Sequence, residues 1–295
     1  MKILVTGDAG FIASRVKLAL ENKGYKVFGY DIVRGQDILD LKGLENAVKE
    51  VDVIFHIAAQ ADLTQMAGSI ESGRIGVLRN VEATHNVAYS CAKHKKWLIY
   101  ASTVCIYGNT KNHPAIEDVT LPNPSELYAC SKYAAEWIVR GYGKNYGMPW
   151  TIQRFATIYG PGMRSALGLH IFFKQAMKGV PITLHGDGNQ DRTLTYVDDL
   201  IDGIIAPLKY PESAKNQVFN LTNSYAISAK QMAEDVIKIV GSNSKIINFP
   251  QRENQIMHED FDVSKARKLL DWGAKTVWEK GLRKTYEWMR TEEMP

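Results

Sequence analysis

Short apolar runs alternate with amphipathic stretches along the first two-thirds of the chain. Runs typical of buried strands cover residues 2–6, 26–30, 51–59, 96–103 and 150–158. Apolar residues with helical spacing lie between them, at 11–22, 76–94 and 125–145. Strands that alternate with helices indicate a parallel sheet with both faces covered, and right-handed crossovers make that sheet doubly wound. The pattern therefore predicts an α/β fold with a Rossmann sheet.

The rhythm changes after Gly160-Pro161-Gly162. Turn-forming Gly, Asp and Asn separate shorter apolar runs there, and helical spacing returns at 196–209, 228–241 and 277–291. We expect a cofactor-binding Rossmann domain over residues 1–163 and a smaller, mixed α/β C-terminal substrate domain over residues 164–295. Segments at about 193–225 are expected to return to the first domain.

Charge and cysteine content argue against several classes of protein. The net charge is only +4 and the Lys and Arg residues are scattered, so nucleic-acid binding has little support. No run approaches the roughly 18–20 apolar residues of a transmembrane helix, and the N-terminal run is too short for a secretory signal. Three cysteines, Cys91, Cys105 and Cys130, are too few for a disulfide framework. We expect a reduced, cytoplasmic protein with no membrane partner.

A glycine-rich segment follows the first predicted strand and opens the first predicted helix. In Thr6-Gly7-Asp8-Ala9-Gly10-Phe11-Ile12-Ala13, Gly7 allows a tight turn and Gly10 lets the backbone approach a pyrophosphate. The helix N-terminus offers unpaired N–H groups to the anion. Such a string can be an ordinary strand–helix turn, but its place at the start of an α/β pattern favours a dinucleotide site.

An acidic residue, Asp31, ends the second predicted strand, a little over 20 residues after the loop. A carboxylate at this position accepts hydrogen bonds from the adenosine ribose and repels a 2′-phosphate, which favours NAD over NADP. Arg34 lies close by in the sequence and could in principle hold such a phosphate. The electrostatic effect of Asp31 nevertheless leads us to expect NAD.

The spacing Tyr128-Ala129-Cys130-Ser131-Lys132 places a phenol and an ammonium on one face of a predicted helix. The ammonium and a positive nicotinamide ring would favour the phenolate and lower the pKa of the phenol from about 10. Alone, this spacing also fits a packed tyrosine beside a surface lysine. Thr103 ends the fourth strand, at the edge of the sheet where ligands bind, and could donate to a substrate oxygen. A turn-capping threonine is the alternative, but the combined set is more specific than any member.

These residues together resemble the extended short-chain dehydrogenase/reductase family, which includes nucleotide-sugar epimerases and dehydratases. The resemblance covers nearly the whole chain. The segment "TGDAGFIAS" is similar to the family's T-G-x-x-G-F-I-G-S loop, "HIAAQ" to H-x-A-A, and "RFATIYGPG" to R-x-x-N-x-Y-G-P. By this resemblance Tyr128, Lys132 and Thr103 are catalytic, and Lys132 also holds the nicotinamide ribose. The implied cofactor contacts are Gly7, Gly10, Phe11, Ile12, Asp31, Asp37, Ile38, Ala58, Ala59, Gln60, Asn80, Tyr128 and Lys132.

The resemblance also implies a nucleotide-sugar substrate. Arg192 and Arg252 would meet its diphosphate, because a guanidinium matches phosphate oxygens; for Arg252 a surface ion pair is an equal alternative. Thr103 and Thr157 complete the implied substrate contacts. Thr157 departs from the family, since many members have Asn there, and this puts the nucleotide contact in doubt. No metal ion is expected.

Two further departures from the family pattern remain, and the second concerns the reaction. Ala13 replaces the third glycine of the loop. Val104 and Cys105 stand where the 4,6-dehydratases carry Asp-Glu, and decarboxylases usually carry Glu at the second position. Both reactions therefore fall behind epimerisation. We expect an NAD-dependent 4-epimerase of a nucleotide-diphospho-sugar, with a UDP-hexose favoured. A ketoreductase, dehydrogenase or dehydratase of the same family is the alternative, and an NAD(H)-sensing regulator is a remote one. The resemblance also implies a homodimer through the helices near 76–94 and 125–145.

Overall fold

The N-terminal part of the chain forms a parallel sheet. A computed structural model describes residues 1–61, 66–110, 114–252 and 256–292. Within these ranges the main sheet has six strands in the order β10-β5-β4-β3-β1-β2, and every neighbouring pair is parallel. The strands are β1 (Lys2–Thr6), β2 (Lys26–Tyr30), β3 (Val53–His56), β4 (Trp97–Thr103), β5 (Trp150–Phe155) and β10 (Gln217–Leu221). The chain passes to opposite sides of β1, so the strand order reverses there, as the doubly wound prediction requires.

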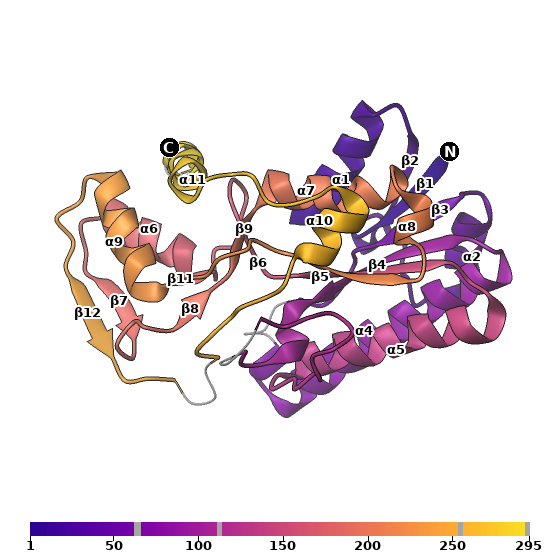
Figure 1. Cartoon of the computed structure of the whole chain (residues 1–295), viewed down its shortest axis with the longest axis horizontal. Helices are drawn as coiled ribbons and strands as arrows, with labels where there is room; N and C mark the ends of the chain where they lie inside the picture. The colour runs from indigo at the N-terminus through magenta and orange to yellow at the C-terminus, as the bar shows by residue number, and fades with distance from the viewer. Residues whose placement is uncertain (62–65, 111–113, 253–255, 293–295) are drawn as a thin grey trace.

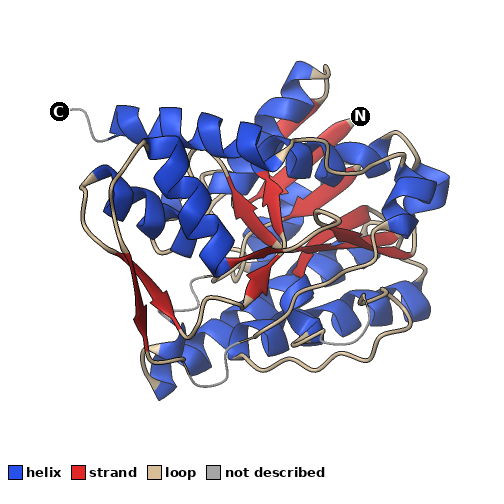
Figure 2. Ribbon diagram, turned by 60° about the vertical axis from the view of Figure 1, so that its left-hand side comes forward, coloured by secondary structure: helices blue, strands red, loops and turns tan. Residues whose placement is uncertain are grey.

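Helices cover both faces of this sheet (Figure 1, Figure 2). One face packs on α2 (Leu41–Lys49), α4 (Ile70–Lys93) and α5 (Leu127–Tyr146), with Leu4 of β1 in that core. The other packs on α1 (Phe11–Asn22) and α7 (Val197–Ile205), with Ile3 and Val5 in that core. Alternate residues of one strand thus enter two different cores, which explains the continuous apolar runs.

The C-terminal residues build a second layer of structure beside the carboxyl ends of the strands (Figure 1). It contains α6 (Gly168–Met177), α9 (Ala229–Val240) and α11 (Trp278–Glu292), with β7 (Ile182–His185) paired to β12 (Ile246–Phe249). Short pairs connect it to the sheet: β6 (Thr157–Tyr159) with β9 (Leu194–Tyr196), and β8 (Asp191–Arg192) with β11 (Ile227–Ser228). The short helices α8 (Pro211–Ala214) and α10 (Ser264–Leu270) lie next to the main sheet. No described helix is both long and apolar enough to cross a membrane.

Several element boundaries differ from the sequence prediction. The helix expected from residue 76 begins at Ile70, because Ser69 and Ser72 form a reciprocal capping box. The run 150–158 divides into β5 and β6, so that Thr157 lies in a separate two-stranded pair. The run 51–59 keeps only Val53–His56 as strand, and the residues after it form the loop that the site requires.

A buried ion pair lies between α5 and β5. The Arg154 guanidinium donates to both carboxylate oxygens of Glu136, at 3.0 and 2.7 Å, and neither side chain is more than 2% exposed. Ser102 donates to the same carboxylate at 2.5 Å. Tyr107 and the carbonyl of Glu117 accept from the remaining guanidinium nitrogen. Every charged atom is paired, as burial in a region of low dielectric demands.

We predict that Arg154→Met destabilises the protein by about 3–5 kcal/mol, because it leaves the Glu136 carboxylate buried without its partner. Urea unfolding measures this loss. Arg140→Met is the matched control: Arg140 pairs with half-exposed Asp118 at 3.1 Å, and its loss should cost less than about 1 kcal/mol. Equal losses in the two variants would contradict this account of the buried pair.

Candidate active site

The glycine loop packs closely against the loop that follows β3. Gly7 has a φ of +72°, and a Cβ placed there would lie 2.8 Å from the Cα of Ala58. Any side chain at position 7 would therefore clash and strain the backbone. Gly10 is the N-cap of α1, and its N–H donates to the Gly7 carbonyl at 2.8 Å. Phe11 and Ile12 open the helix, so its free N–H groups lie at this edge of the sheet.

Asp31 joins the second strand to the glycine loop. Its side chain is buried, and one carboxylate oxygen accepts from the Ala9 N–H at 3.0 Å. The other accepts from the Val33 N–H at 3.0 Å and caps a short 3-10 helix. Further lone pairs on the same oxygens remain to accept ribose hydroxyls. Asp37 and Ile38 follow in the next turn, where the Ile38 carbonyl accepts from Asn86 of α4.

Asn80 clamps the loop after β3 to the start of α5. Its side-chain carbonyl accepts from the Gln60 N–H at 2.7 Å, and its amide donates to the Gln60 carbonyl at 3.1 Å. The same amide donates to the Ser131 hydroxyl, which in turn donates to the Tyr128 carbonyl at 2.7 Å. Ala58, Ala59 and Gln60 are thereby fixed relative to the helix turn that carries Tyr128 and Lys132. Sequence reasoning identified Asn80 but not the bridging role of Ser131.

Lys132 is buried, with 2% of its surface exposed, and its ammonium lies 4.3 Å from the centre of the Tyr100 ring. Burial lowers the pKa of Lys132 to about 7, although the Glu136 carboxylate opposes the shift. His56, at the end of β3, bonds Thr6 at 2.8 Å and Thr84 at 3.2 Å. Burial, assisted by Lys132, lowers the pKa of His56 to about 3, so this imidazole stays neutral.

Tyr128 lies one turn before Lys132 on α5 and is half-buried. Burial raises the pKa of its phenol, the Cys105 thiol adds to the rise, and Arg164 opposes it. The sequence analysis expected a lowered pKa in the presence of the ammonium and a positive nicotinamide ring. Without a bound cofactor Tyr128 is therefore a neutral phenol, and a positively charged nicotinamide ring bound beside it would favour the phenolate.

Thr103 ends β4 beside this helix. Its hydroxyl accepts from the Cys105 N–H at 3.2 Å and lies 3.5 Å from the Phe155 carbonyl, to which it donates. The hydroxyl therefore caps the 3-10 helix Val104–Tyr107. This is the turn-capping role that the sequence left open as the alternative to a substrate contact. Burial raises the pKa of the Cys105 thiol to about 11, and the Glu259 carboxylate raises it further. Cys105 is thus held as a neutral thiol between Thr103 and the C-terminal layer.

The four predicted substrate contacts, Thr103, Thr157, Arg192 and Arg252, lie on different elements of the structure. Arg192 lies on β8, where its Nε is 3.5 Å from a carboxylate oxygen of Glu259. Thr157 lies on β6, in register with Leu194 of β9. Arg252 is exposed beyond β12, and no contact between described residues ties it to Arg192. Thr103 lies at the end of β4, where its hydroxyl accepts from the Cys105 N–H as described above.

Glu259 is a buried carboxyl that sequence reasoning missed. It accepts from the Thr193 N–H at 3.0 Å, and its own N–H donates to Asp191 at 2.7 Å. Burial raises the pKa of Glu259 to about 7, while Arg192 opposes the shift. The residue lies in a loop without helical or strand periodicity, so no pattern in the sequence distinguished it from a surface glutamate.

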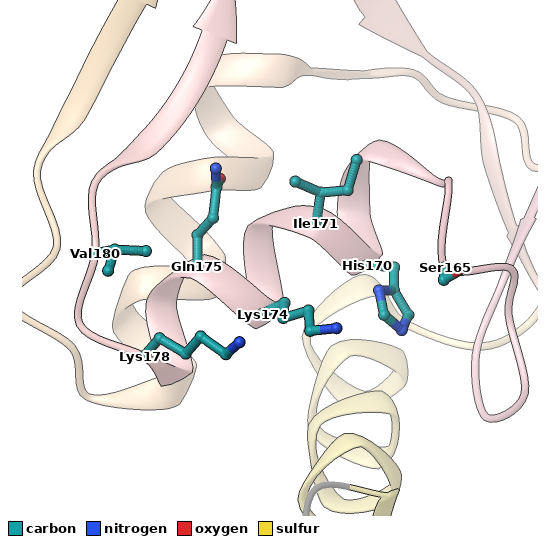
Figure 3. Close-up of a pocket in the computed structure, with 7 residues that line it drawn as sticks. All are labelled: Ser165, His170, Ile171, Lys174, Gln175, Lys178 and Val180. Atoms are coloured by element: carbon teal, nitrogen blue, oxygen red, sulfur yellow. The ribbon is translucent and has the colours of Figure 1, made fainter. Parts of the chain in front are cut away.

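A separate shallow pocket lies on α6, away from these residues (Figure 3). His170, Lys174 and Lys178 follow one another along the helix, and Ser165, Ile171, Gln175 and Val180 complete the lining. None of them comes from the glycine loop, β4 or α5. The pocket is therefore lined by none of the site residues described above.

Comparison with known proteins gives a consistent picture. The sequence profile described as the NAD dependent epimerase/dehydratase family matches residues 3–222. A UDP-glucuronate 4-epimerase of Thermodesulfobacterium geofontis is 32% identical, over 97% of this chain and 95% of that protein. A UDP-N-acetyl-alpha-D-glucosaminuronate decarboxylase of Bacillus cytotoxicus is 29% identical, over 99% and 98%. The crystal structure of the UDP-glucose 4-epimerase of Thermotoga maritima with UDP-glucose has a TM-score of 0.91 and 26% identity, over 99% of both chains.

We predict that Glu259 makes the protein less stable as the pH rises from about 4.5 to 7. In this window the folded protein keeps a proton that the unfolded chain has released, so rising pH favours the unfolded chain until the folded carboxyl also ionises near pH 7. Relative to Glu259→Gln, the wild-type protein should lose on the order of 3 kcal/mol across the window. Urea unfolding at each pH measures this, with Glu50→Gln, at an exposed site, as control. A wild-type protein that gains stability relative to Glu259→Gln would contradict the sign.

Proposed function

We propose, since this chain belongs to the NAD-dependent epimerase/dehydratase family, that it is an epimerase acting at C4 of a UDP-linked sugar. The observation that carries the proposal is the Asn80 clamp, which fixes the Tyr128–Lys132 turn relative to the loop after β3. A phenol at the edge of a dinucleotide-binding sheet suits removal of a proton from a hydroxyl. The names of the three similar proteins reported above all include a UDP-sugar.

The residues around the glycine loop fit NAD. The α1 N-terminus and the turn Gly7–Gly10 would hold the pyrophosphate, and Asp31 the adenosine ribose. Asp37 and Ile38 would contact the adenine, Ala58 to Gln60 would line the nicotinamide side, and Lys132 would hold the second ribose. The bound cofactor would supply the chemistry of removing a hydride from sugar C4 and returning it to the opposite face.

In the proposed reaction Tyr128 first loses its own proton to solvent when the oxidised cofactor binds. The resulting phenolate would then accept the proton of the sugar 4-hydroxyl as hydride leaves C4. Lys132, one turn away, stabilises the phenolate and keeps its own proton only partly at neutral pH, since its pKa is about 7. Thr103 would hold the sugar oxygen by turning its hydroxyl away from the Phe155 carbonyl, to which it donates at 3.5 Å in the structure. After the 4-keto sugar has rotated in the site, Tyr128 would return the proton to the C4 oxygen. The reaction therefore consumes and releases no net proton.

Arg192 would bind the diphosphate, with Thr157 beside the nucleotide. Arg252, which is exposed after β12, would be a second contact to the diphosphate. We favour a neutral hexose such as UDP-glucose or UDP-galactose as substrate. The support for a neutral hexose is the Thermotoga maritima UDP-glucose 4-epimerase, whose structure with UDP-glucose this chain resembles with a TM-score of 0.91.

The alternatives differ in what they require at Cys105 or in cofactor use. Dehydratases and decarboxylases use an acid where this chain has Cys105, a neutral, half-buried thiol. A ketoreductase or dehydrogenase would exchange its cofactor at each turnover, whereas an epimerase would retain it. An NAD(H)-sensing regulator would need no Tyr–Lys pair. We place the protein in the cytoplasm because its three cysteines are free thiols. We also propose that the cofactor-binding domain ends at residue 163 and the substrate domain begins at residue 164.

We predict that Tyr128→Phe lowers the rate of 4-epimerisation by two orders of magnitude or more, because it removes the phenol oxygen that would take the proton. The assay follows interconversion of UDP-glucose and UDP-galactose by NMR without added NAD, with UDP-glucuronate as a parallel substrate. The variant should retain NAD as well as the wild type does. Near-normal turnover by Tyr128→Phe would refute the role of Tyr128, and dependence on added NAD(H) would favour the ketoreductase.

We also propose a homodimer through the exposed sides of α4 and α5, which pack on each other. Ile75, Leu78 and Trp137 expose 40, 50 and 57% of their surfaces there. We predict that Leu78→Glu converts the dimer to a monomer, since a charge in an apolar interface is costly. Light scattering measures the mass, and Leu18→Glu on α1, where 57% of the leucine is exposed, is the control. A monomeric wild type, or a dimeric Leu78→Glu variant, would contradict this interface.

A further inference from the structure

A buried carboxylate lies within the glycine loop itself. Asp8 follows Gly7, and its side chain is only 4% exposed. Its carboxylate lies over β2, where a Cβ built on Gly29 would be 1.8 Å from one of its oxygens. The absence of a side chain at position 29 therefore creates the space that Asp8 fills. The fold therefore fixes the position of the Asp8 carboxylate. The tight turn at Gly7 and Gly10 does not itself need an acidic residue at position 8.

Two cations contact Asp8. Arg34 donates to one carboxylate oxygen in a close ion pair, and the ammonium of Lys17 is 3.9 Å from the other. Arg34 ends the 3-10 helix Ile32–Arg34 that Asp31 caps, and it also reaches the side-chain carbonyl of Gln36 at 3.4 Å. Arg34 is 45% exposed, so the ion pair lies at the mouth of the loop.

The pair lies where the adenosine ribose would bind. Asp31 accepts from the Ala9 N–H, and Ala9 is the neighbour of Asp8. Asp8, Asp31 and Arg34 therefore converge on one corner of the predicted cofactor site. A 2′-phosphate entering this corner would meet the Asp31 carboxylate, and Arg34 is the guanidinium best placed to neutralise it.

We propose that Asp8 is a specificity-determining residue that occupies Arg34 and so keeps the site selective for NAD over NADP. With Asp8 present, the negative charges of Asp8 and Asp31 balance the positive charges of Arg34 and Lys17 at this corner. The Arg34 guanidinium is then already paired with a carboxylate. Without Asp8, the corner carries one net positive charge and a guanidinium that is available for a phosphate. Selectivity then rests on two acids with different tasks: Asp31 repels the 2′-phosphate, and Asp8 withholds the cation that would attract it. The proposal depends on NAD binding and is independent of the reaction catalysed.

The test compares the affinities of NAD+ and NADP+ for cofactor-free protein by isothermal titration calorimetry. We expect the wild type to prefer NAD+, and Asp8→Ala to shift the ratio of the two affinities by about tenfold or more toward NADP+. The double variant Asp8→Ala/Arg34→Ala should lose this shift. In the Asp8→Ala background, Lys26→Ala is the matched control, because it removes a cation that lies over the Phe28 ring of β2; the shift should persist there.

An unchanged ratio in Asp8→Ala would overturn the proposal, and so would an equal shift with and without Arg34. If Asp8→Ala fails to fold, Asp8→Asn keeps the volume over Gly29 and removes the charge. It should shift the ratio in the same direction and also depend on Arg34. Because the readout is binding, a protein that binds NAD but epimerises no sugar would leave this result interpretable.

Discussion

The burial of the Lys132 ammonium constrains the rest of the site. A cation in an apolar environment loses its hydration, and the fold responds by lowering the pKa of Lys132 to about 7 and placing the Tyr100 ring beneath it. Glu136 could neutralise it, but both of its oxygens are held by Arg154. Among the described residues Lys132 therefore forms no ion pair, and it lies one helical turn after Tyr128 on α5. Burial of Lys132 thus places a weakly held positive charge on α5, one turn after Tyr128.

The same constraint explains why the protein alone does not activate its base. Burial raises the pKa of Tyr128, and the neighbouring thiol of Cys105 adds to the effect. A positively charged nicotinamide ring would reverse this balance, since it would add a second cation next to the phenol. Proton removal would then occur only when the oxidised cofactor is in place. The Asn80 clamp fixes the loop after β3 relative to the turn of α5 that carries Tyr128 and Lys132.

Much of the fold could be predicted from the sequence, because strand and helix periodicities are local signals. The strands 2–6 and 26–30 and the helix 11–22 have the predicted bounds. The sixth strand, β10, was not predicted as a strand, since its place beside β5 is decided by a contact between residues more than 60 positions apart. The catalytic motif lies on one helix turn and could be found by spacing. Asp8, Ser131 and Glu259 could not, because their roles come from side chains that meet only after folding. The assignment of the site residues itself remains a prediction.

Ultraviolet difference spectroscopy of the Tyr128 ionisation tests the central claim most directly. The spectrum of Tyr128→Phe is subtracted from that of the wild type during a pH titration, with and without saturating NAD+. The account predicts that the phenolate band of Tyr128 appears at a clearly lower pH when NAD+ is bound, and that Lys132→Met reduces the shift. An ionisation at the same pH in the free and bound protein would contradict it.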